Sequence, residues 1–236
     1  MAQAHPRPAV RGSTFVRLLA RMGEVDAAQP SGSLPDRLSH WLSWTQSLAL
    51  SSALDGQPAP LDDDIALGET PSEALLEGAR SALLEAVNDE ASWARARSRA
   101  IARAGAVEGD AVTRVDYSAL RERYLLMQRS IQGTTGKLRG QLRDHLAASS
   151  PELARLAEVD AVMEGALSPR EQRLLGGVAS MLESRFDKAK KVAEANAGAT
   201  AAWLDVFIQE MQDVLLAELD VRFQPLEGLI AALRSH

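Results

Sequence analysis

Cysteine is absent from this chain of 236 residues, which excludes disulfide bonds and metal sites built on thiolates. Aromatic residues are also scarce, at 4% against 46% hydrophobic residues, so the core has to be built mainly from Leu, Ala, Val and Met. Lysine is rare too, since 22 of the 26 basic residues are Arg. The formal net charge of -6 provides no overall attraction to nucleic acid or to anionic lipid.

Long hydrophobic runs are missing as well. No run approaches the ~20 residues that cross a bilayer, and the first residues lack the apolar centre of a signal peptide. We therefore expect a protein of the bacterial cytoplasm that inserts no segment into a membrane. Residues 1–12 contain two prolines and few apolar side chains, and they are predicted to be a disordered N-terminus.

No stretch alternates apolar and polar residues as a half-buried strand does, whereas helical spacing recurs along the chain. The sequence therefore predicts an all-α fold, an elongated bundle of seven or eight helices with one long central helix. That central helix is predicted over 116–149, where Asp116 is expected to be the N-cap. Its apolar positions recur every three, four or seven residues and are Tyr117, Leu120, Tyr124, Met127, Ile131, Leu138, Leu142 and Leu146.

Residues 13–236 are expected to form a single all-α domain. It is divided into an N-terminal helical hairpin over 13–54, an acidic loop over 55–69 and a main helical bundle over 70–236. The loop is recognised because it contains two prolines and two glycines and has no helical spacing.

Serine, threonine and proline mark the predicted helix starts. Ser13 and Ser33 are expected to start the two helices of the hairpin. In the main bundle, starts are predicted at Thr70-Pro71, at Ser150-Pro151 and at Ser168-Pro169.

Two interruptions are also predicted. The helix that follows Thr70 is expected to pause at Asn88-Asp89 and to resume through Trp93. The last helix, which begins at Thr200, has the most apolar pattern. Pro225 should kink or end it, because the proline ring removes one backbone hydrogen bond.

No motif predicts catalysis or a cofactor. The stretch 133–137, G-T-T-G-K, has only two residues between its glycines and no preceding strand, so it fails the pattern of a phosphate-binding loop. His145 beside Asp144 could form a base with its orienting acid, but adjacent helical residues point about 100° apart, and a surface histidine is preferred. The acidic run 62–64 lacks the pattern of a calcium loop. We therefore expect no enzymatic activity, no cofactor and no bound metal.

Charge is distributed unevenly along the chain. Residues 93–143 carry ten Arg and one Lys against four acids, whereas 55–77 carry seven acids and no base. The basic side chains could follow a phosphate backbone, or they could pair with the acidic loop and the acidic last helix of the same chain. Internal pairing is favoured, because the excess is cancelled within the chain and no stacking aromatic residues accompany it.

The candidate interaction surface combines part of this basic segment with a tryptophan. Trp41 and Trp44 lie on neighbouring flanks of one predicted helix, so one is expected to be buried and the other to lie at an interface. The candidate residues are Arg121, Arg129, Lys137, Arg139, Arg143 and Trp44.

Four segments of the chain resemble one known family. They are R-G-S-T-F-V-R-L-L-A at 11–20, L-P-D-R-L-S-H-W-L-S-W-T at 34–45, V-D-Y-S-A-L-R-E-R-Y-L-L-M-Q-R at 115–129 and L-A-E-L-D-V-R-F-Q-P-L-E-G-L-I-A-A-L at 216–233. The family is a proteobacterial domain of unknown function of similar length, and the resemblance spans nearly the whole chain. The family has no assigned activity, so the resemblance implies no site residues. It implies genes that neighbour those of proton-channel-like and OmpA-like envelope proteins, and hence an accessory to an envelope machine.

The function expected from the sequence is therefore a non-enzymatic, cytoplasmic helical scaffold or adaptor that mediates protein–protein interaction. The expected partner is a protein bound to the membrane or envelope, or a second copy of the chain. The alternative is a nucleic-acid-associated protein that uses the basic segment 93–143, and this partner is the less expected of the two.

Overall fold

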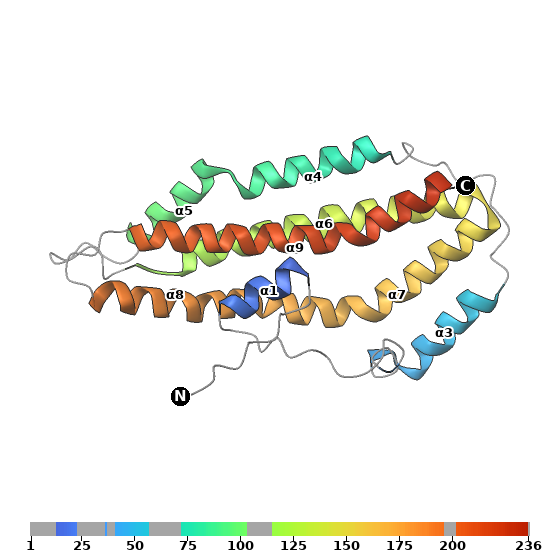
Figure 1. Ribbon diagram of the computed structural model, residues 1–236, viewed down its shortest axis with the longest axis horizontal. Coiled ribbons are helices and arrows are strands. Elements are labelled where there is room, and N and C mark those ends of the chain that lie inside the picture. Colours follow the sequence, from blue (N-terminus) through green and yellow to red (C-terminus); the bar gives the residue numbers. More distant parts are fainter. Residues whose placement is uncertain are drawn as a thin grey trace, which may run out of the picture.

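The computed structural model describes residues 13–22, 36, 41–56, 72–102, 115–195 and 202–235. Two long helices, α6 (Ser118–Ser149) and α9 (Ala202–Ser235), run side by side along the long axis of the molecule and pack against each other (Figure 1). The described residues contain helices and no strand. The predicted all-α class is thus confirmed. The long helix expected at the centre is α6, and α9 is a second helix of similar length beside it.

The central helix begins slightly later than predicted. Tyr117 occupies the N-cap position of α6 and makes no side-chain cap, so the expectation that Asp116 is the N-cap is wrong. The backbone N–H of Asp116 donates to the carbonyl of Ala100 at 3.0 Å, which ties this residue to the preceding helix. Its carboxylate still accepts a hydrogen bond from the backbone N–H of Ser118 at 3.1 Å, so it satisfies one of the unpaired donors at the helix start.

Two shorter helices cover one side of the α6–α9 pair (Figure 1). They are α4 (Glu73–Val87) and α5 (Glu90–Ala102), and the predicted pause between them is confirmed. Ser72 is the N-cap of α4 and accepts from the backbone N–H of Leu75 at 3.2 Å, so the helix starts two residues after the predicted Thr70-Pro71 signal. The indole N–H of Trp93 donates to the carbonyl of Val87 at 2.7 Å and fixes the angle between the two helices.

The opposite side is formed by α7 (Pro151–Gly176) and α8 (Val178–Ala195). Ser150 caps α7 as predicted, with its hydroxyl 3.3 Å from the backbone nitrogen of Leu153. The helix start predicted at Ser168-Pro169 is wrong, because α7 continues through Pro169. Proline removes the hydrogen bond to the carbonyl of the residue four positions earlier, and its ring crowds that carbonyl. That residue, Gly165, is exposed, so its freed carbonyl can bind water.

Pro225 likewise lies inside a helix, and α9 continues through it to Ser235. The prediction that Pro225 ends the helix is therefore wrong, and the alternative that it kinks the helix stays a prediction. The side chains on both sides of the proline, Phe223 and Leu226, are buried in the core. Their burial stabilises the helix against the loss of one backbone hydrogen bond.

Helices α1 and α3, the N-terminal helices within the described residues, pack on different partners. Helix α1 (Thr14–Arg21), capped by Ser13 as predicted, lies on α9, whereas α3 (Trp44–Asp55) lies on α7 at one end of the molecule (Figure 1). Residues 23–35 and 37–40 lie outside the described part of the chain, so the hairpin expected over 13–54 stays a prediction. Ser43 and Gln46 form a capping box at the start of α3, so the segment expected to be one helix from Ser33 begins a new helix at Trp44. Residues 1–12 and 57–69 lie outside the described residues.

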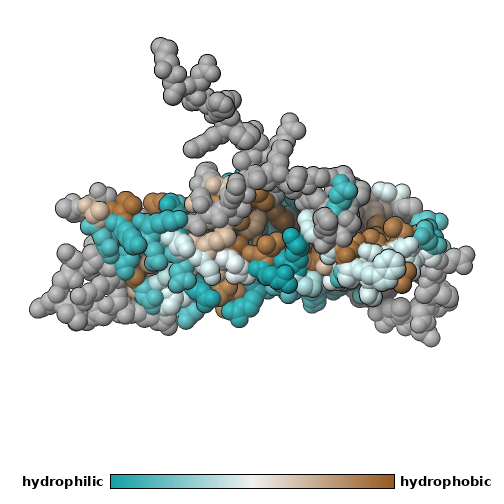
Figure 2. Space-filling model, turned by 90° about the horizontal axis from the view of Figure 1, so that it is seen from below, coloured by the Kyte–Doolittle hydropathy of each residue, from teal (hydrophilic) through white to brown (hydrophobic). Residues whose placement is uncertain are grey.

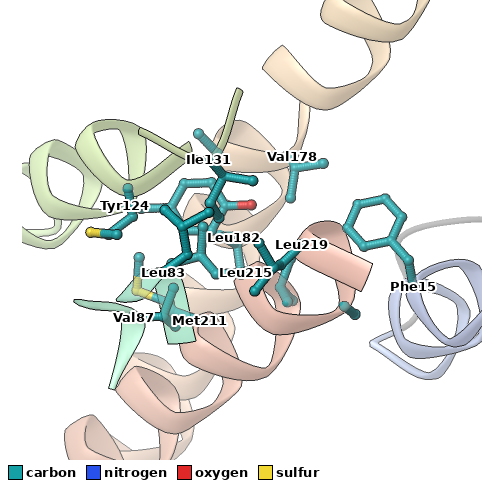
Figure 3. Close-up of a cluster of buried hydrophobic side chains, with 14 of the residues drawn as sticks. Phe15, Leu83, Val87, Tyr124, Ile131, Val178, Leu182, Met211, Leu215 and Leu219 are labelled. Atoms are coloured by element: carbon teal, nitrogen blue, oxygen red, sulfur yellow. The ribbon is translucent and has the colours of Figure 1, made fainter. Parts of the chain in front are cut away.

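Among the described residues, one core cluster joins α1, α4, α5, α6, α7, α8 and α9, and α3 contributes no side chain to it. Figure 3 shows part of it, where side chains from different helices converge. The labelled residues are Phe15, Leu83, Val87, Tyr124, Ile131, Val178, Leu182, Met211, Leu215 and Leu219. Within the described part of the chain, no helix has the length and apolar character needed to cross a membrane.

Candidate functional site

Two of the candidate basic residues are held inside the fold. Arg139 makes a bidentate pair with Asp160 of α7, with Nε–Oδ2 and Nη2–Oδ1 distances of 2.8 and 2.6 Å. Arg143 contacts the same carboxylate at 3.3 Å and also pairs with Glu164. Burial alone would lower the pKa of Arg139, but the hydrogen bond and charge of Asp160 outweigh it and raise that pKa. These arginines therefore attach α6 to α7.

Other arginines of the basic segment also have partners within the chain. Arg97 pairs with Asp205 of α9 at 2.7 Å. Arg123 donates to the carbonyl of Ala86 at 2.6 Å, its guanidinium lies 5.6 Å from the ring centre of Trp93, and burial lowers its pKa. The pairing of Arg97 with the last helix follows the favoured interpretation, whereas the α7 carboxylates that hold Arg139 and Arg143 were not foreseen.

The remaining candidate basic residues are exposed. Arg121, Arg129 and Lys137 make no ion pair with any residue that the structure describes. The guanidinium Nε of Arg129 donates only to the carbonyl of Leu125 in its own helix, at 3.1 Å. The structure thus divides the five candidate basic residues into an internal pair and an exposed group on α6.

A groove lies between α5 and α6. Its volume is ≈ 800 Å³, and its lining includes Arg95, Arg99, Glu122, Arg123 and Leu126. Arg99 and Glu122 lie 3.8 Å apart across it, and both are more than half exposed. The leucine is 55% exposed although its neighbours along the helix face the core. The groove therefore combines an apolar wall with an excess of arginine.

A buried polar network crosses the core between α6, α7 and α9. Glu218 of α9 is only 1% exposed and accepts from the amide of Gln128 at 3.0 Å and from the guanidinium of Arg222 at 2.9 Å. Arg222 also pairs with Glu171 of α7 at 2.9 Å. Burial raises the pKa of Glu218, although the hydrogen bonds from Gln128 and Arg222 oppose that shift. The hydroxyl of Tyr124 is buried and makes no hydrogen bond with any described residue.

Arg222 and Glu171 of this network also line a second hollow of ≈ 620 Å³, which is formed by residues of α6, α7 and α9. Arg139 and Glu164 line it as well. Each of these charges already has a partner of opposite sign in the chain. The arrangement therefore favours a role in aligning three helices over a role in chemistry.

The histidine, the glycine-rich stretch and the acidic run that were considered for catalysis or metal binding lie in different parts of the chain. His145 is buried, at 9% exposure, so the prediction of a surface histidine is wrong. It lies on the same face of α6 as Leu138 and Leu142, which the core covers. Residues 133–137 are ordinary turns of α6, and residues 62–64 lie outside the described residues. Among the residues that the structure does describe, no group of three His, Asp or Glu side chains could hold a metal ion.

Trp44 occupies a separate surface on α3. It is 84% exposed, and Leu48 and Leu54 of the same helix are 58% and 52% exposed. Ala53 is the buried residue of this helix. The helix has no charged residue before Asp55. We refer to Trp44, Leu48 and Leu54 as the α3 face. In Figure 2, pale and brown atoms predominate at the end of the molecule where α3 lies, and teal atoms cover much of α8.

Sequence reasoning missed the Gln128–Glu218–Arg222 network. A signal was present, because Glu218 stands between Leu215 and Leu219 in the apolar stripe of the last helix. A carboxylate at such a position is either buried with a partner or lies at the edge of the stripe. The partner comes from a helix 90 residues away, which local spacing does not indicate.

Comparison with known proteins identifies the family. No curated protein and no solved structure matches the chain. A family model described as a protein of unknown function (DUF3348) matches residues 1–235. This match covers nearly the whole sequence, so it extends well beyond the four segments in which the resemblance was noted. The chain belongs to the DUF3348 family.

Proposed function

We propose that this protein is a non-enzymatic helical scaffold or adaptor that holds a protein partner through the α3 face. The observation that supports the proposal is the exposure of Trp44 and Leu48 on a helix with no charged residue before Asp55. The apolar side of a helix is normally buried against another element. Among the described helices α3 packs mainly on α7, and Trp44 and Leu48 remain exposed and available to a partner.

The chemistry of the face fits a protein partner. Tryptophan is enriched among the residues that dominate binding energy at protein interfaces. Exposed apolar patches without charges are also typical of interaction sites. The ion pairs of Arg139 and Arg143 with α7 support a rigid bundle from which α3 is presented. The proposed setting is the cytoplasm beside an envelope machine, and this part rests on the family resemblance alone.

The test compares three forms of the full-length tagged protein isolated from gently solubilised cells. They are the wild type, a Trp44→Ser/Leu48→Ser variant and a Leu174→Ser control, whose leucine is 64% exposed on α7. The proposal expects a protein recovered in stoichiometric amount with the wild type and the control and lost with the α3 variant. Recovery of the same proteins with all three forms would contradict it. Light scattering on the purified forms distinguishes a second copy from a different protein.

A second candidate function is association with nucleic acid, which is favoured by the exposure of Arg121, Arg129 and Lys137 without ion pairs among the described residues. Binding through phosphates would weaken steeply as salt concentration rises. Nucleic acid that leaves the isolated protein on raising salt, and that is lost in an Arg129→Glu/Lys137→Glu variant, would support this candidate. Retention of a protein partner at the same salt would favour the adaptor.

A further inference from the structure

The groove between α5 and α6 is distinct from the α3 face and has a different chemistry. Three arginines and one glutamate line it, Arg95, Arg99, Arg123 and Glu122, which leaves an excess of two positive charges. Arg123 is held in place by the Ala86 carbonyl at 2.6 Å and by the ring of Trp93. The groove therefore has one fixed cation at its side.

The other two arginines have only weak contacts. The guanidinium of Arg95 donates to the hydroxyl of Ser92 at 2.8 Å and is exposed. Arg99 lies 3.8 Å from Glu122, with both side chains more than half exposed. An exposed pair at this distance contributes little to stability. Both guanidinium groups can therefore turn towards carboxylates of a ligand at low cost.

The groove also has an apolar component. Leu126 is 55% exposed and lies in the groove lining together with Ala94. A leucine in this position gains free energy when apolar atoms cover it. A ligand that fits the groove thus needs apolar side chains on one side and negative charges at its borders.

From this combination we infer that the α5–α6 groove binds an acidic amphipathic helix of a partner protein. A helix laid in a hydrophobic groove between two helices is a common mode of recognition. Its leucine-like side chains contact Leu126, and its carboxylates pair with Arg95 and Arg99. This inference goes beyond the adaptor role of the α3 face, because it identifies a second binding surface and the kind of partner that it accepts.

Nucleic acid fits the groove less well. Binding of single strands usually requires exposed aromatic rings on which bases stack, but the nearest rings, Trp93 and Tyr124, are 3% and 0% exposed. Glu122 repels phosphates. Contact with a charged phosphate backbone would also bury little of the exposed Leu126 side chain against apolar atoms, so it would contribute little binding free energy.

The test uses a fluorescein-labelled synthetic helix with leucines at helical spacing and glutamates elsewhere, and follows its anisotropy with the full-length protein. Two groove variants are compared with the wild type, Leu126→Glu and Arg95→Glu/Arg99→Glu. Two controls carry the same kinds of change on the exposed end of α7, Leu174→Glu and Arg173→Glu. Circular dichroism and thermal unfolding establish that each variant is folded.

We expect each groove variant to weaken the peptide about tenfold or more, since it replaces a contact at the centre of the site. The controls and Trp44→Ser are expected to leave the affinity unchanged. Equal affinity for all forms, or equal binding of the same peptide with lysines in place of glutamates, would overturn the inference. So would an oligothymidylate probe that binds more tightly than the peptide and is affected by Arg95→Glu/Arg99→Glu but not by Leu126→Glu. The adaptor proposal is tested separately, by loss of a partner in the Trp44→Ser/Leu48→Ser variant, so failure of the peptide assay leaves it unaffected.

Discussion

Helices α3 and α9 are both rich in apolar residues, yet they are buried to very different extents. In α9, 14 of the 34 residues are buried, because α6, α8, α4 and α1 all pack around it. In α3, Ala53 is the buried residue among 12, because its contact is with α7. The comparison teaches that apolar character is a property of the segment, whereas burial depends on the number of neighbours that the fold brings to it.

The two helices depart in opposite directions from the simple rule that apolar side chains are buried and charged ones are exposed. Helix α9 carries a glutamate, Glu218, into the core, where Gln128 and Arg222 bind it. Helix α3 keeps Trp44 and Leu48 at the surface. A buried charge that is fully paired adds little net stability, but it favours the register in which its partners meet. The departures from the simple rule in α9 therefore serve the alignment of helices, and those in α3 are proposed to serve binding.

The largest effect is expected from Arg222→Met. This change leaves Glu218 buried without its cationic partner, so the free energy of unfolding should fall by about 3–5 kcal/mol. Denaturation with urea measures it. A double variant, Glu218→Leu/Arg222→Met, removes both charges and should recover most of the loss. A loss below about 1 kcal/mol in the single variant would show that water enters the network and solvates the carboxylate.

Truncation of leucine on the two helices tests the comparison directly. Leu215→Ala in α9 creates a cavity at a position that is 0% exposed, and we expect a loss of roughly 2–5 kcal/mol in unfolding free energy. Leu48→Ala in α3 should change it by less than about 0.5 kcal/mol. Both values come from the same denaturation experiment. Similar losses for the two variants would mean that α3 is covered in solution.

The raised pKa of Glu218 predicts a smaller effect that depends on pH. Between the ordinary pKa of a glutamate and the raised value, the folded state binds more protons at this site than the unfolded state does. The contribution of Glu218 to stability is therefore fully present below the ordinary pKa and is lost as pH rises through the raised one. Glu218→Gln should remove this decline from the stability profile, and Glu158→Gln, at an exposed position on α7, should preserve it. Parallel profiles for the wild type and Glu218→Gln would contradict the prediction.

The smallest effect on stability is expected for Trp44→Phe, within about 0.5 kcal/mol, because the side chain is exposed. The informative measurement is quenching of tryptophan fluorescence by iodide. Trp44 is 84% exposed, whereas Trp93 is 3% exposed and Trp41 and Trp203 are half-buried, so the quenchable part of the emission should fall in the variant. Unchanged quenching would show that the α3 face is already covered in the purified protein.

Much of the fold could be predicted from local patterns. The caps at Ser13 and Ser150 and the pause at Asn88-Asp89 follow from the backbone chemistry of single residues. The start predicted at Ser168-Pro169 failed, because serine followed by proline is compatible with a helix interior when the freed carbonyl is exposed. The sequence shows where a helix could start, but the packing of α7 on both sides of Pro169 decides whether the helix is interrupted there.

The candidate site was less predictable than the fold. Trp44 was selected as an interaction residue and is exposed in the structure, whereas Arg139 and Arg143 were grouped with Arg121, Arg129 and Lys137 although their charges pair with carboxylates of α7. Their partners, Asp160 and Glu164, each lie 21 residues further along the chain, on the next helix. Ion pairing depends on which faces of two helices meet, and the charge of a segment does not contain that information.

The sequence by itself determined the all-α class, the approximate length of α6, the helix starts at Ser13 and Ser150 and the pause at Asn88-Asp89, because helical spacing and capping act over a few neighbouring residues. The tertiary structure decided which apolar residues are buried, which arginines are neutralised and where the α5–α6 groove forms. Burial and pairing depend on residues such as Gln128 and Glu218 that are distant in the chain and meet only after α6, α7 and α9 have packed.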